Sequence, residues 1–273
     1  MALDIPGILL LAGAGNMGGA LLKGWLDQGL APSRLIIQDP SPPPAIAALL
    51  AAHGLKAEAA PILARPPDVI LVAVKPQIMA QVFPSVARHA GPETVVLSVA
   101  AGKTIASFEA LLPQRTAVVR SIPNTPASVG RGITAACANA YVTSTQKALC
   151  DKLLCAVGAV GWVADEHLID AATAVSGSGP AYVFLLAECL AEAGVKAGLP
   201  PDLAAQLARW TVAGSGEMLH RSDLDAATLR QNVTSPNGTT HAALQVLMAP
   251  DGLQPLLTAA VAAATKRSAE LAG

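Results

Sequence analysis

The chain has 273 residues, enough for one large domain or two ordinary ones. Its residues are 52% hydrophobic and 14% charged, and 18 basic and 19 acidic residues give a net charge of −1. The basic residues form no cluster and only 3% of residues are aromatic, so a nucleic-acid partner, which needs phosphate contacts or base stacking, is not expected.

The first apolar segment, Ile5–Leu22, carries no charge and is long enough to cross a membrane. It contains five glycines and Asn16, and Asp4 precedes it where a signal peptide would have basic residues. The sequence therefore predicts a cytoplasmic protein without a membrane partner. Its four cysteines form no CxxC pair, follow no metal-site spacing and are expected to be reduced core residues.

The first half of the chain alternates short apolar runs with longer amphipathic segments. This alternation predicts a mostly parallel sheet that is covered by helices on both faces. The expected strands are Ile8–Ala12, Arg34–Gln38, Val69–Val74, Thr94–Val99, Ala117–Ile122 and Ile133–Ala136. The expected helices are Gly18–Gln28, Pro44–His53 and Ile78–Ala90.

From about Ala164 onward, segments rich in Ala and Leu and separated by Gly or Pro favour helices. They are Ala171–Val175, Ala181–Gly194, Asp202–Leu219, Ala226–Gln231, Thr239–Met248 and Leu253–Leu271. The stretch Thr258–Thr265 (TAAVAAAT) has no charge, and a helix that is apolar nearly all round is usually buried. Because a small helical domain cannot bury so much surface against itself, we expect residues 164–273 to form an all-α dimerisation domain.

Three glycines, Gly13, Gly15 and Gly18, join the first expected strand to the first expected helix in the stretch LLLAGAGNMGG. The first permits a sharp turn, the second lets the backbone approach a pyrophosphate, and the third lets helix and strand pack closely. The helix N-terminus would then face the phosphates. In this context the motif predicts that residues 1–163 are an α/β Rossmann-like domain that binds a dinucleotide; an ordinary glycine turn is the alternative.

Asp39 ends the second expected strand. A carboxylate there can accept hydrogen bonds from a ribose 2′-hydroxyl and repels the 2′-phosphate of NADPH. The following stretch, PSPPPAIAALLAAH, has no Arg or Lys to bind that phosphate. NADH is therefore slightly favoured over NADPH; the alternative is that Asp39 is only a turn residue before Pro40.

Further strand ends are expected at the ligand-binding edge of the sheet. The stretch VAVKP places Lys75 where it can contact a cofactor phosphate or ribose, or be a solvated lysine. The small residues of SVAAG, Ser98–Gly102, allow a nicotinamide ring to pack closely, and IPNTP, Ile122–Pro126, is a rigid turn. The residues expected to contact the cofactor are Gly13, Gly15, Asn16, Met17, Gly18, Asp39, Val74, Lys75, Pro76 and Ala100.

The polar stretch NVTSPNGTTHAAL, Asn232–Leu244, opens an apolar helix. The first backbone N–H groups of such a helix have no intrahelical acceptor and, with the helix dipole, form an anion site. The hydroxyls of Ser235, Thr239 and Thr240 would suit a small carboxylate with one adjacent polar atom; simple helix capping is the alternative. No strong general base and no metal site is expected, so a cofactor would perform the chemistry.

Seven blocks follow in order over nearly the whole chain: AGAGNMGGALLKG, VAVKPQIM, SVAAGKTI, RSIPNTPASVG, AVSGSGPAYVF, GVKAGLP and NVTSPNGTTHAAL. Together they resemble the pyrroline-5-carboxylate reductase family, to which SGSGPAY and the last two blocks are specific. The resemblance implies a Rossmann domain, a helical domain that dimerises by intertwining, and a homodimer able to assemble into larger oligomers. It also implies NAD(P)H-dependent reduction of 1-pyrroline-5-carboxylate, a small-molecule substrate, to L-proline in proline biosynthesis.

The resemblance further implies a substrate site. Ser235, Gly238 and Thr239 would hold the substrate carboxylate, and Thr240 would bind the ring nitrogen as the catalytic residue. The chain departs from the family at Asn237, where glycine is usual, and at Asp39, where many members have a small hydroxyl residue and prefer NADPH. Because Asn tolerates left-handed backbone geometry, we expect the loop to keep its shape.

Two other functions remain alternatives. A β-hydroxyacid-dehydrogenase-like reductase of another small acid would need a lysine on the first helix of the second domain, but AYVFLLAECLAEAG has none before Lys196. A non-catalytic dinucleotide-binding module would bind NAD(H) without turnover, and the SPNGTT loop would then have no function.

Overall fold

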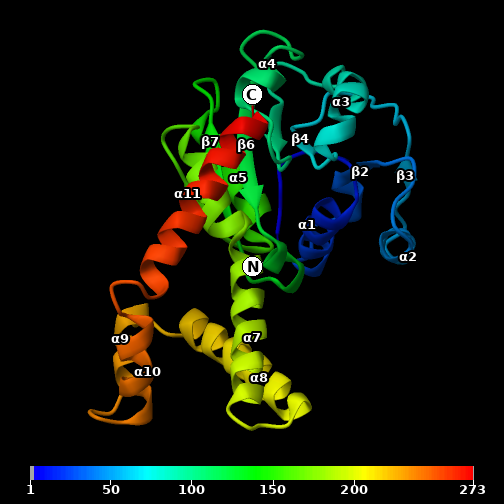
Figure 1. The fold of residues 1–273 in the computed structure, drawn as a ribbon. Coiled ribbons are helices and arrows are strands. Elements are labelled where there is room, and N and C mark those ends of the chain that lie inside the picture. Colours follow the sequence, from blue (N-terminus) through cyan, green and yellow to red (C-terminus); the bar gives the residue numbers. More distant parts are fainter. Residues whose placement is uncertain (1–2, 273) are drawn as a thin grey trace. The chain divides into compact units, whose positions relative to one another are not determined.

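The computed structural model describes residues 3–272, which form two compact units (Figure 1). The first unit contains the residues up to Gly177 together with those from Ala264 onward, and the second contains Ser178–Ala263. The chain therefore leaves the first unit and returns to it along helix α11, Leu253–Ala272. The domain boundary expected between residues 163 and 164 stays a prediction, because a compact unit need not coincide with a functional domain.

An eight-stranded sheet forms the centre of the first unit, in the order β3-β2-β1-β4-β5-β6-β7-β8. Neighbouring strands are parallel except for β6 and β7, which are antiparallel. The strands are β1 Leu9–Ala12, β2 Leu35–Gln38, β3 Ala57–Glu58, β4 Val69–Val72, β5 Val95–Ser98, β6 Ala117–Pro123, β7 Gly132–Ala138 and β8 Gly158–Trp162. The expected mostly parallel sheet is confirmed, and its strand order reverses between β1 and β4.

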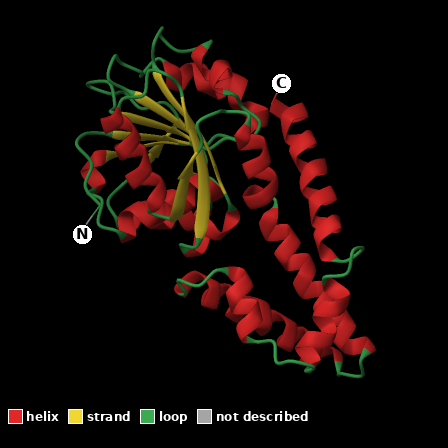
Figure 2. Ribbon diagram, turned by 90° about the vertical axis from the view of Figure 1, so that its left-hand side faces the viewer, coloured by secondary structure: helices red, strands yellow, loops and turns green. Residues whose placement is uncertain are grey.

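Helices cover both faces of this sheet, as expected (Figure 2). The two faces arise because successive side chains of a strand point in opposite directions: Leu9 and Leu11 belong to one buried cluster, Leu10 and Ala12 to the other. The first cluster includes residues of α1 Asn16–Asp27, α2 Pro44–Ala52 and α5 Ser144–Cys155. The second includes residues of α3 Met79–Ala87, α4 Ile105–Glu109 and α6 Leu168–Ala172.

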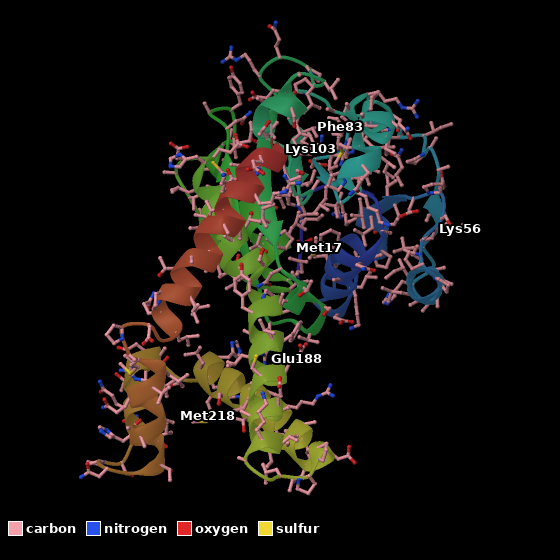
Figure 3. The ribbon with its side chains drawn as sticks, viewed as in Figure 1. Met17, Lys56, Phe83, Lys103, Glu188 and Met218 are labelled. Atoms are coloured by element: carbon pink, nitrogen blue, oxygen red, sulfur yellow. The ribbon has the colours of Figure 1, made fainter. Side chains whose placement is uncertain are left out.

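Aromatic and aliphatic side chains fill both clusters. In the second cluster, Phe83 of α3, labelled in Figure 3, meets Phe108 of α4 edge to face, and the ring centroids are 5.0 Å apart. In the first, the buried Trp25 of α1 donates from Nε1 to the carbonyl oxygen of Leu153 in α5 at 2.8 Å. This hydrogen bond satisfies the polar atom of a fully buried side chain and joins two helices on the same face of the sheet.

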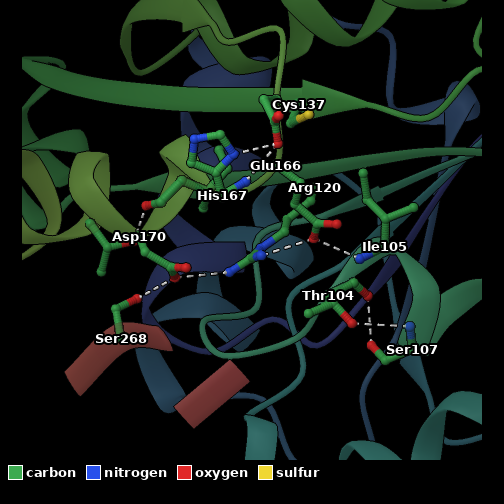
Figure 4. A network of polar contacts seen from close by, with 12 residues as sticks. Thr104, Ile105, Ser107, Arg120, Cys137, Glu166, His167, Asp170 and Ser268 are labelled. Carbon is green, nitrogen blue, oxygen red and sulfur yellow. Dashed lines mark hydrogen bonds and ion pairs between the residues drawn. The ribbon is translucent and has the colours of Figure 1, made fainter. Parts of the chain in front are cut away.

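A network of charges around the buried Arg120, with the partly buried Glu166 and Asp170, joins β6 to the helices of the second face (Figure 4). Arg120 of β6 is 2% exposed; its Nη1 donates to Glu166 Oε1 at 2.8 Å, and its Nη2 lies 3.7 Å from Asp170 Oδ1. Glu166 Oε1 also accepts from the backbone N–H of Ile105 at 2.8 Å. Asp170 Oδ1 accepts from Ser268 Oγ of α11 at 2.7 Å. The guanidinium therefore ties β6 to the start of α4, to α6 and to the returning helix.

Some elements differ from the sequence-based expectation. Strands β3 and β8 and helices α4 and α5 were not predicted, and the expected helix Ala171–Val175 is divided between the end of α6 and a π-helical turn, Thr173–Gly177. Helix α5 begins with a capping box between Thr143 and Gln146, a signal that hydropathy alone does not contain.

The cysteines are also less uniformly placed than expected. Cys137 and Cys150 are buried, but Cys155 and Cys189 are exposed, so the prediction that all of them are core residues is wrong. Burial raises the pKa of the Cys150 thiol to about 12, which keeps it protonated and unreactive at neutral pH.

The second unit is helical, as expected. Its helices are α7 Gly179–Lys196, α8 Pro201–Arg221, α9 Ala226–Asn232 and α10 Thr239–Leu247, followed by the first part of α11. Large apolar side chains of this unit are exposed rather than buried; Phe184, Trp210 and Val246 are 62%, 70% and 72% exposed. An exposed apolar surface of this extent is typical of an interaction site.

Replacing Arg120 with alanine tests the buried network. The change leaves Glu166 and Asp170 without their cation, and loss of one partner from a buried ion pair is strongly destabilising. We expect the free energy of unfolding, measured by urea denaturation at fixed protein concentration, to fall by roughly 3 kcal/mol. Arg34→Ala, at an exposed position, is the control and should change it by less than about 0.5 kcal/mol. Equal effects of the two substitutions would contradict the role of the network.

Candidate functional site

The expected cofactor-binding residues lie at the carboxyl ends of four neighbouring strands, β2, β1, β4 and β5, on the loops there and in the first turn of α1. Asp39 follows β2, Gly13 and Gly15 follow β1, Lys75 follows β4 and Ala100 follows β5. In open parallel sheets, ligands bind outside these ends, at the point where the strand order reverses. The structure thus brings the predicted residues together at the edge where a dinucleotide would bind.

The three glycines of the first loop have different surroundings. Gly13 has φ +91°, and a Cβ there would lie 2.8 Å from the carbonyl oxygen of Ala73. A Cβ on Gly18 would lie 2.1 Å from the carbonyl oxygen of Gly13. In contrast, no described residue lies within 4 Å of a Cβ built on Gly15. The packing of the chain itself therefore requires Gly13 and Gly18, whereas Gly15 borders open space.

Helix α1 begins directly after this loop. Its N-cap is Gly15, and among the described residues no side chain caps its first turn, so the N–H groups there can bind an anion. Met17 lies in this first turn (Figure 3). A cavity of ≈ 750 Å³ borders Gly15, Asn16 and Met17 and is also lined by Ile46 and Leu49 of α2. The sequence did not indicate this apolar wall, because hydropathy does not show which loop a helix packs beside.

The carboxylate of Asp39 binds backbone groups on both sides. Its Oδ2 accepts from the N–H of Ala14 at 2.7 Å, and its Oδ1 accepts from the N–H of Ser41 at 2.8 Å. The first bond joins the glycine loop to the end of β2, and the second forms a turn before α2. Asp39 therefore has the turn role that was the alternative, and each oxygen keeps a second lone pair for a donor such as a ribose hydroxyl.

The loops after β4 and β5 form the other side of this edge. Val74 is buried, Pro76 begins a short 3₁₀ turn, and Lys75 between them is exposed, with no ion pair to another described residue. The Lys75 ammonium is thus available to a phosphate, although a solvated lysine remains the alternative. Ala100 is buried, and its N–H donates to Ser98 Oγ at 3.1 Å, which fixes the loop after β5.

In the second unit, a tight turn precedes α10. Pro236 and Asn237 occupy its centre, and the N–H of Gly238 donates to the carbonyl oxygen of Ser235 at 3.0 Å. Asn237 has φ +58°, which is the left-handed conformation that glycine adopts most readily. A Cβ on Gly238 would lie 3.1 Å from the Ser235 carbonyl oxygen, so a larger residue would crowd the turn.

Gly238 is the N-cap of α10 and has no side chain to bind the free amides of the first turn. Within the described part of the chain, no other side chain caps them, so the capping alternative for this loop is not what the structure contains. Ser235 and Thr239 are exposed and Thr240 is partly buried. The turn therefore offers free N–H groups and hydroxyls at one helix N-terminus, which can bind a carboxylate.

A cavity of ≈ 490 Å³ lies beside this loop, lined in part by Arg230, Thr234 and His241. Arg230 is partly buried, with Nη1 3.6 Å from the sulfur of Met248, and forms no ion pair with another described residue. Sequence analysis gave Arg230 no role. A basic residue four positions before Thr234 was the available signal, but only the fold shows that Arg230, Thr234 and His241 line one cavity.

Comparisons with known proteins cover both units. Residues 166–271 match a family profile described as pyrroline-5-carboxylate reductase dimerisation, and residues 7–102 match one described as NADP oxidoreductase, coenzyme F420-dependent. The pyrroline-5-carboxylate reductase of Pseudomonas aeruginosa is 42% identical over 262 residues, which are 95% of this chain and 95% of that protein. The chain belongs to the pyrroline-5-carboxylate reductase family.

Solved structures of pyrroline-5-carboxylate reductases share the fold. The protein from Coxiella burnetii has a TM-score of 0.91 at 34% identity, covering 98% of this chain and 99% of that one. The Plasmodium falciparum protein, solved with NADP bound, has a TM-score of 0.79 at 32% identity, covering 98% of both chains. The family suggested by the seven sequence blocks is confirmed, as is a Rossmann-like region followed by a helical dimerisation region.

The dimerisation region explains the exposed apolar surface of the helices. One helical run in the described chain, Leu168–Lys196, is long and apolar enough to cross a membrane by length and composition, and 6% of the apolar 18-residue window within it is buried. A subunit interface would use the same apolar surface. This run is therefore weak evidence for a membrane span.

Alanine substitutions at Gly15 and Gly18 distinguish a glycine needed for close approach of the cofactor from a glycine needed for packing of the chain. Because a Cβ on Gly15 meets no described residue, Gly15→Ala should leave the urea midpoint unchanged but weaken NAD(P)H binding, measured by cofactor fluorescence, by about tenfold. Gly18→Ala, the comparison variant, should lower the free energy of unfolding by about 1–3 kcal/mol through its contact with Gly13. Normal cofactor affinity in Gly15→Ala would remove Gly15 from the site.

Proposed function

We propose that this chain reduces 1-pyrroline-5-carboxylate to L-proline with a hydride from NAD(P)H, the last step of proline biosynthesis. The observation that carries the proposal is the 42% identity to a curated pyrroline-5-carboxylate reductase over 95% of both chains. The uncapped start of α1 and the uncapped, hydroxyl-bearing start of α10 support it, because one suits a pyrophosphate and the other a small carboxylate.

The cofactor site of this proposal is the edge of the sheet described above. The amides of the first loop and the start of α1 bind the pyrophosphate, with Gly15 as the point of close approach. Lys75 binds a cofactor phosphate or ribose, and Ala100 leaves room for the nicotinamide ring. The residues assigned to the cofactor are Gly13, Gly15, Asn16, Met17, Gly18, Asp39, Val74, Lys75, Pro76 and Ala100.

Asp39 decides the choice of cofactor in this proposal. Its carboxylate accepts from the ribose 2′-hydroxyl of NADH and repels the 2′-phosphate of NADPH, so NADH is slightly favoured. The Plasmodium falciparum relative was solved with NADP, which is a property of that protein.

The substrate site of this proposal is the loop before α10. The Ser235 hydroxyl and the amides of Gly238 and Thr239 donate to the substrate carboxylate, aided by the helix dipole. Thr240 contacts the ring nitrogen, whose protonation makes the adjacent carbon a better hydride acceptor, and the proton comes from solvent. When bound, NAD(P)H supplies the hydride that is added to this carbon.

The residues of the helical unit argue against a β-hydroxyacid-dehydrogenase-like reaction. That chemistry would use a lysine on the first long helix of the second domain, and the lysine of α7 is Lys196 at its C-terminal end. A non-catalytic dinucleotide-binding module would leave the free amides and hydroxyls before α10 without a ligand.

We further propose a cytoplasmic homodimer that can assemble into larger oligomers.

Steady-state oxidation of NADH and of NADPH, measured in parallel with pyrroline-5-carboxylate as the acceptor, tests the proposed function. Turnover with NADH ahead supports both the reaction and the role of Asp39. Turnover with NADPH ahead supports the reaction and leaves Asp39 as a turn residue. Cofactor binding without turnover would contradict the proposed reaction and favour one of the alternatives.

Thr240→Ala tests the contact with the ring nitrogen. Because the substitution removes one hydroxyl at the reacting group, we expect kcat/KM for pyrroline-5-carboxylate to fall about 100-fold while the Kd of the cofactor stays within about twofold. Thr145→Ala, at an exposed helical threonine of the first unit, is the matched control and should behave like the wild type. Full activity of Thr240→Ala would remove Thr240 from the mechanism.

Asp39→Asn tests cofactor selection. The amide keeps the shape of the side chain but removes the charge that repels a 2′-phosphate, so the ratio of kcat/KM with NADH to kcat/KM with NADPH should fall about tenfold. Asn has one acceptor oxygen, so the hydrogen bond from the N–H of Ala14 or of Ser41 is lost. This loss lowers kcat/KM with both cofactors alike and therefore does not change their ratio. Asp27→Asn in α1 is the control, and an unchanged ratio in Asp39→Asn would limit Asp39 to its turn role.

A further inference from the structure

The π-helical turn Thr173–Gly177 contains a carbonyl group that cannot be satisfied in the usual way. In an α-helix the carbonyl oxygen of Ser176 would accept from the N–H of the residue four positions later, but that residue is Pro180, which has no N–H. The N–H of Ala181, one position further, donates instead to the carbonyl oxygen of Ser178 at 3.0 Å. Ser176 therefore needs a donor from elsewhere in the chain.

Asn124 supplies this donor. Its Nδ2 donates to the carbonyl oxygen of Ser176 at 3.1 Å, and its Oδ1 accepts from the N–H of Ile133 in β7 at 3.0 Å. The side chain is 8% exposed, and both ends of its amide bind backbone groups. Asn124 belongs to the IPNTP turn after β6, to which neither the proposed cofactor site nor the proposed substrate site assigns a role. It links the sheet directly to the π-helical turn.

The turn that Asn124 holds lies at the edge of the sheet where ligands bind. A Cβ on Gly177 would lie 3.7 Å from Cγ2 of Ile122, near the carboxyl end of β6. Ala174 is fully buried, whereas Val175 next to it is 60% exposed. The chain enters the second unit immediately after Gly177. The turn is thus both part of the ligand edge and the last anchored segment before the helices that carry the substrate loop.

We propose that Asn124 is a positioning residue for hydride transfer: by satisfying the Ser176 carbonyl that Pro180 leaves without a donor, it fixes the π-helical turn at the ligand edge and the start of α7. This inference rests on the proposed reductase function. The hydrogen bonds of the Asn124 side chain go to Ser176 and Ile133 rather than to residues assigned to the cofactor, so we expect its loss to affect the alignment of the reacting groups rather than cofactor affinity. Displacements of about 1 Å in such alignments can cost about 100-fold in rate.

Asn124→Asp is the first test variant, because it keeps an oxygen for the N–H of Ile133 and loses the donor to Ser176. We expect kcat to fall roughly 30-fold, with the Kd for NADH and for NADPH, measured by fluorescence, within about twofold of wild type. Pro180→Ala restores an N–H four positions after Ser176 and on its own should change kcat by less than about threefold. In the double variant, the new N–H should return kcat to within about fivefold of wild type.

Asn139→Asp is the matched control. Asn139 also binds backbone groups across the β6–β7 pair, accepting from the N–H of Val118 at 3.1 Å and donating to the carbonyl oxygen of Thr116 at 3.0 Å, but at the opposite end of β6. It further accepts from the N–H of Tyr141 at 3.2 Å and donates to Glu109 Oε1 at 2.8 Å. It should therefore lower the urea midpoint without changing kcat.

The outcomes separate the possible roles. Loss of NADH or NADPH binding in Asn124→Asp, an unchanged kcat in that variant, or failure of Pro180→Ala to restore kcat in the double variant would overturn the proposal. If the wild type does not turn over pyrroline-5-carboxylate, the proposed function fails, but hydrogen exchange of residues 173–182 still tests the link to Ser176. Exchange there should rise in Asn124→Asp and return towards wild type in the double variant; unchanged exchange would overturn the link itself.

Discussion

The buried guanidinium of Arg120 is the constraint on which the arrangement of the first unit depends. A cation taken out of water is stable only beside anions and hydrogen-bond acceptors, and here Glu166 and Asp170 provide them. Both carboxylates also accept from other elements, Glu166 from the start of α4 and Asp170 from Ser268 of α11. One charge on β6 thereby determines where three helical segments attach to the sheet.

At the ligand edge, side chains that hydrogen-bond to backbone groups also join neighbouring elements. Asp39 joins the glycine loop to the end of β2, and Asn124 joins β7 to the π-helical turn. Loops carry the functional residues of many enzymes, and a loop can orient a reactant only if its backbone is held in place. In this chain, the positions of the loops at the edge depend on polar side chains of neighbouring loops as much as on the strands.

The sequence predicted the features whose signals are local. Apolar runs located β1, β2, β4 and β5, the glycine spacing located the loop after β1, and the tolerance of Asn for left-handed geometry agrees with φ +58° at Asn237. It missed β3, which is two residues long, and the Arg120 network, whose first ion pair joins residues 46 apart. The sequence shows that Pro180 has no N–H to donate to the Ser176 carbonyl oxygen. It does not show that Asn124, 52 residues from Ser176, donates to this oxygen instead.

The return of α11 has a consequence for synthesis on the ribosome. Domains generally fold as units while the chain emerges, the N-terminal one first. Here Asp170 bonds to Ser268, and a Cβ on Gly102 would lie 3.2 Å from the carbonyl oxygen of Leu271, so the first unit includes residues made after the entire second unit. The nascent Rossmann-like unit can form its sheet early. Its surface that contacts α11 stays exposed until about the last ten described residues have left the exit tunnel.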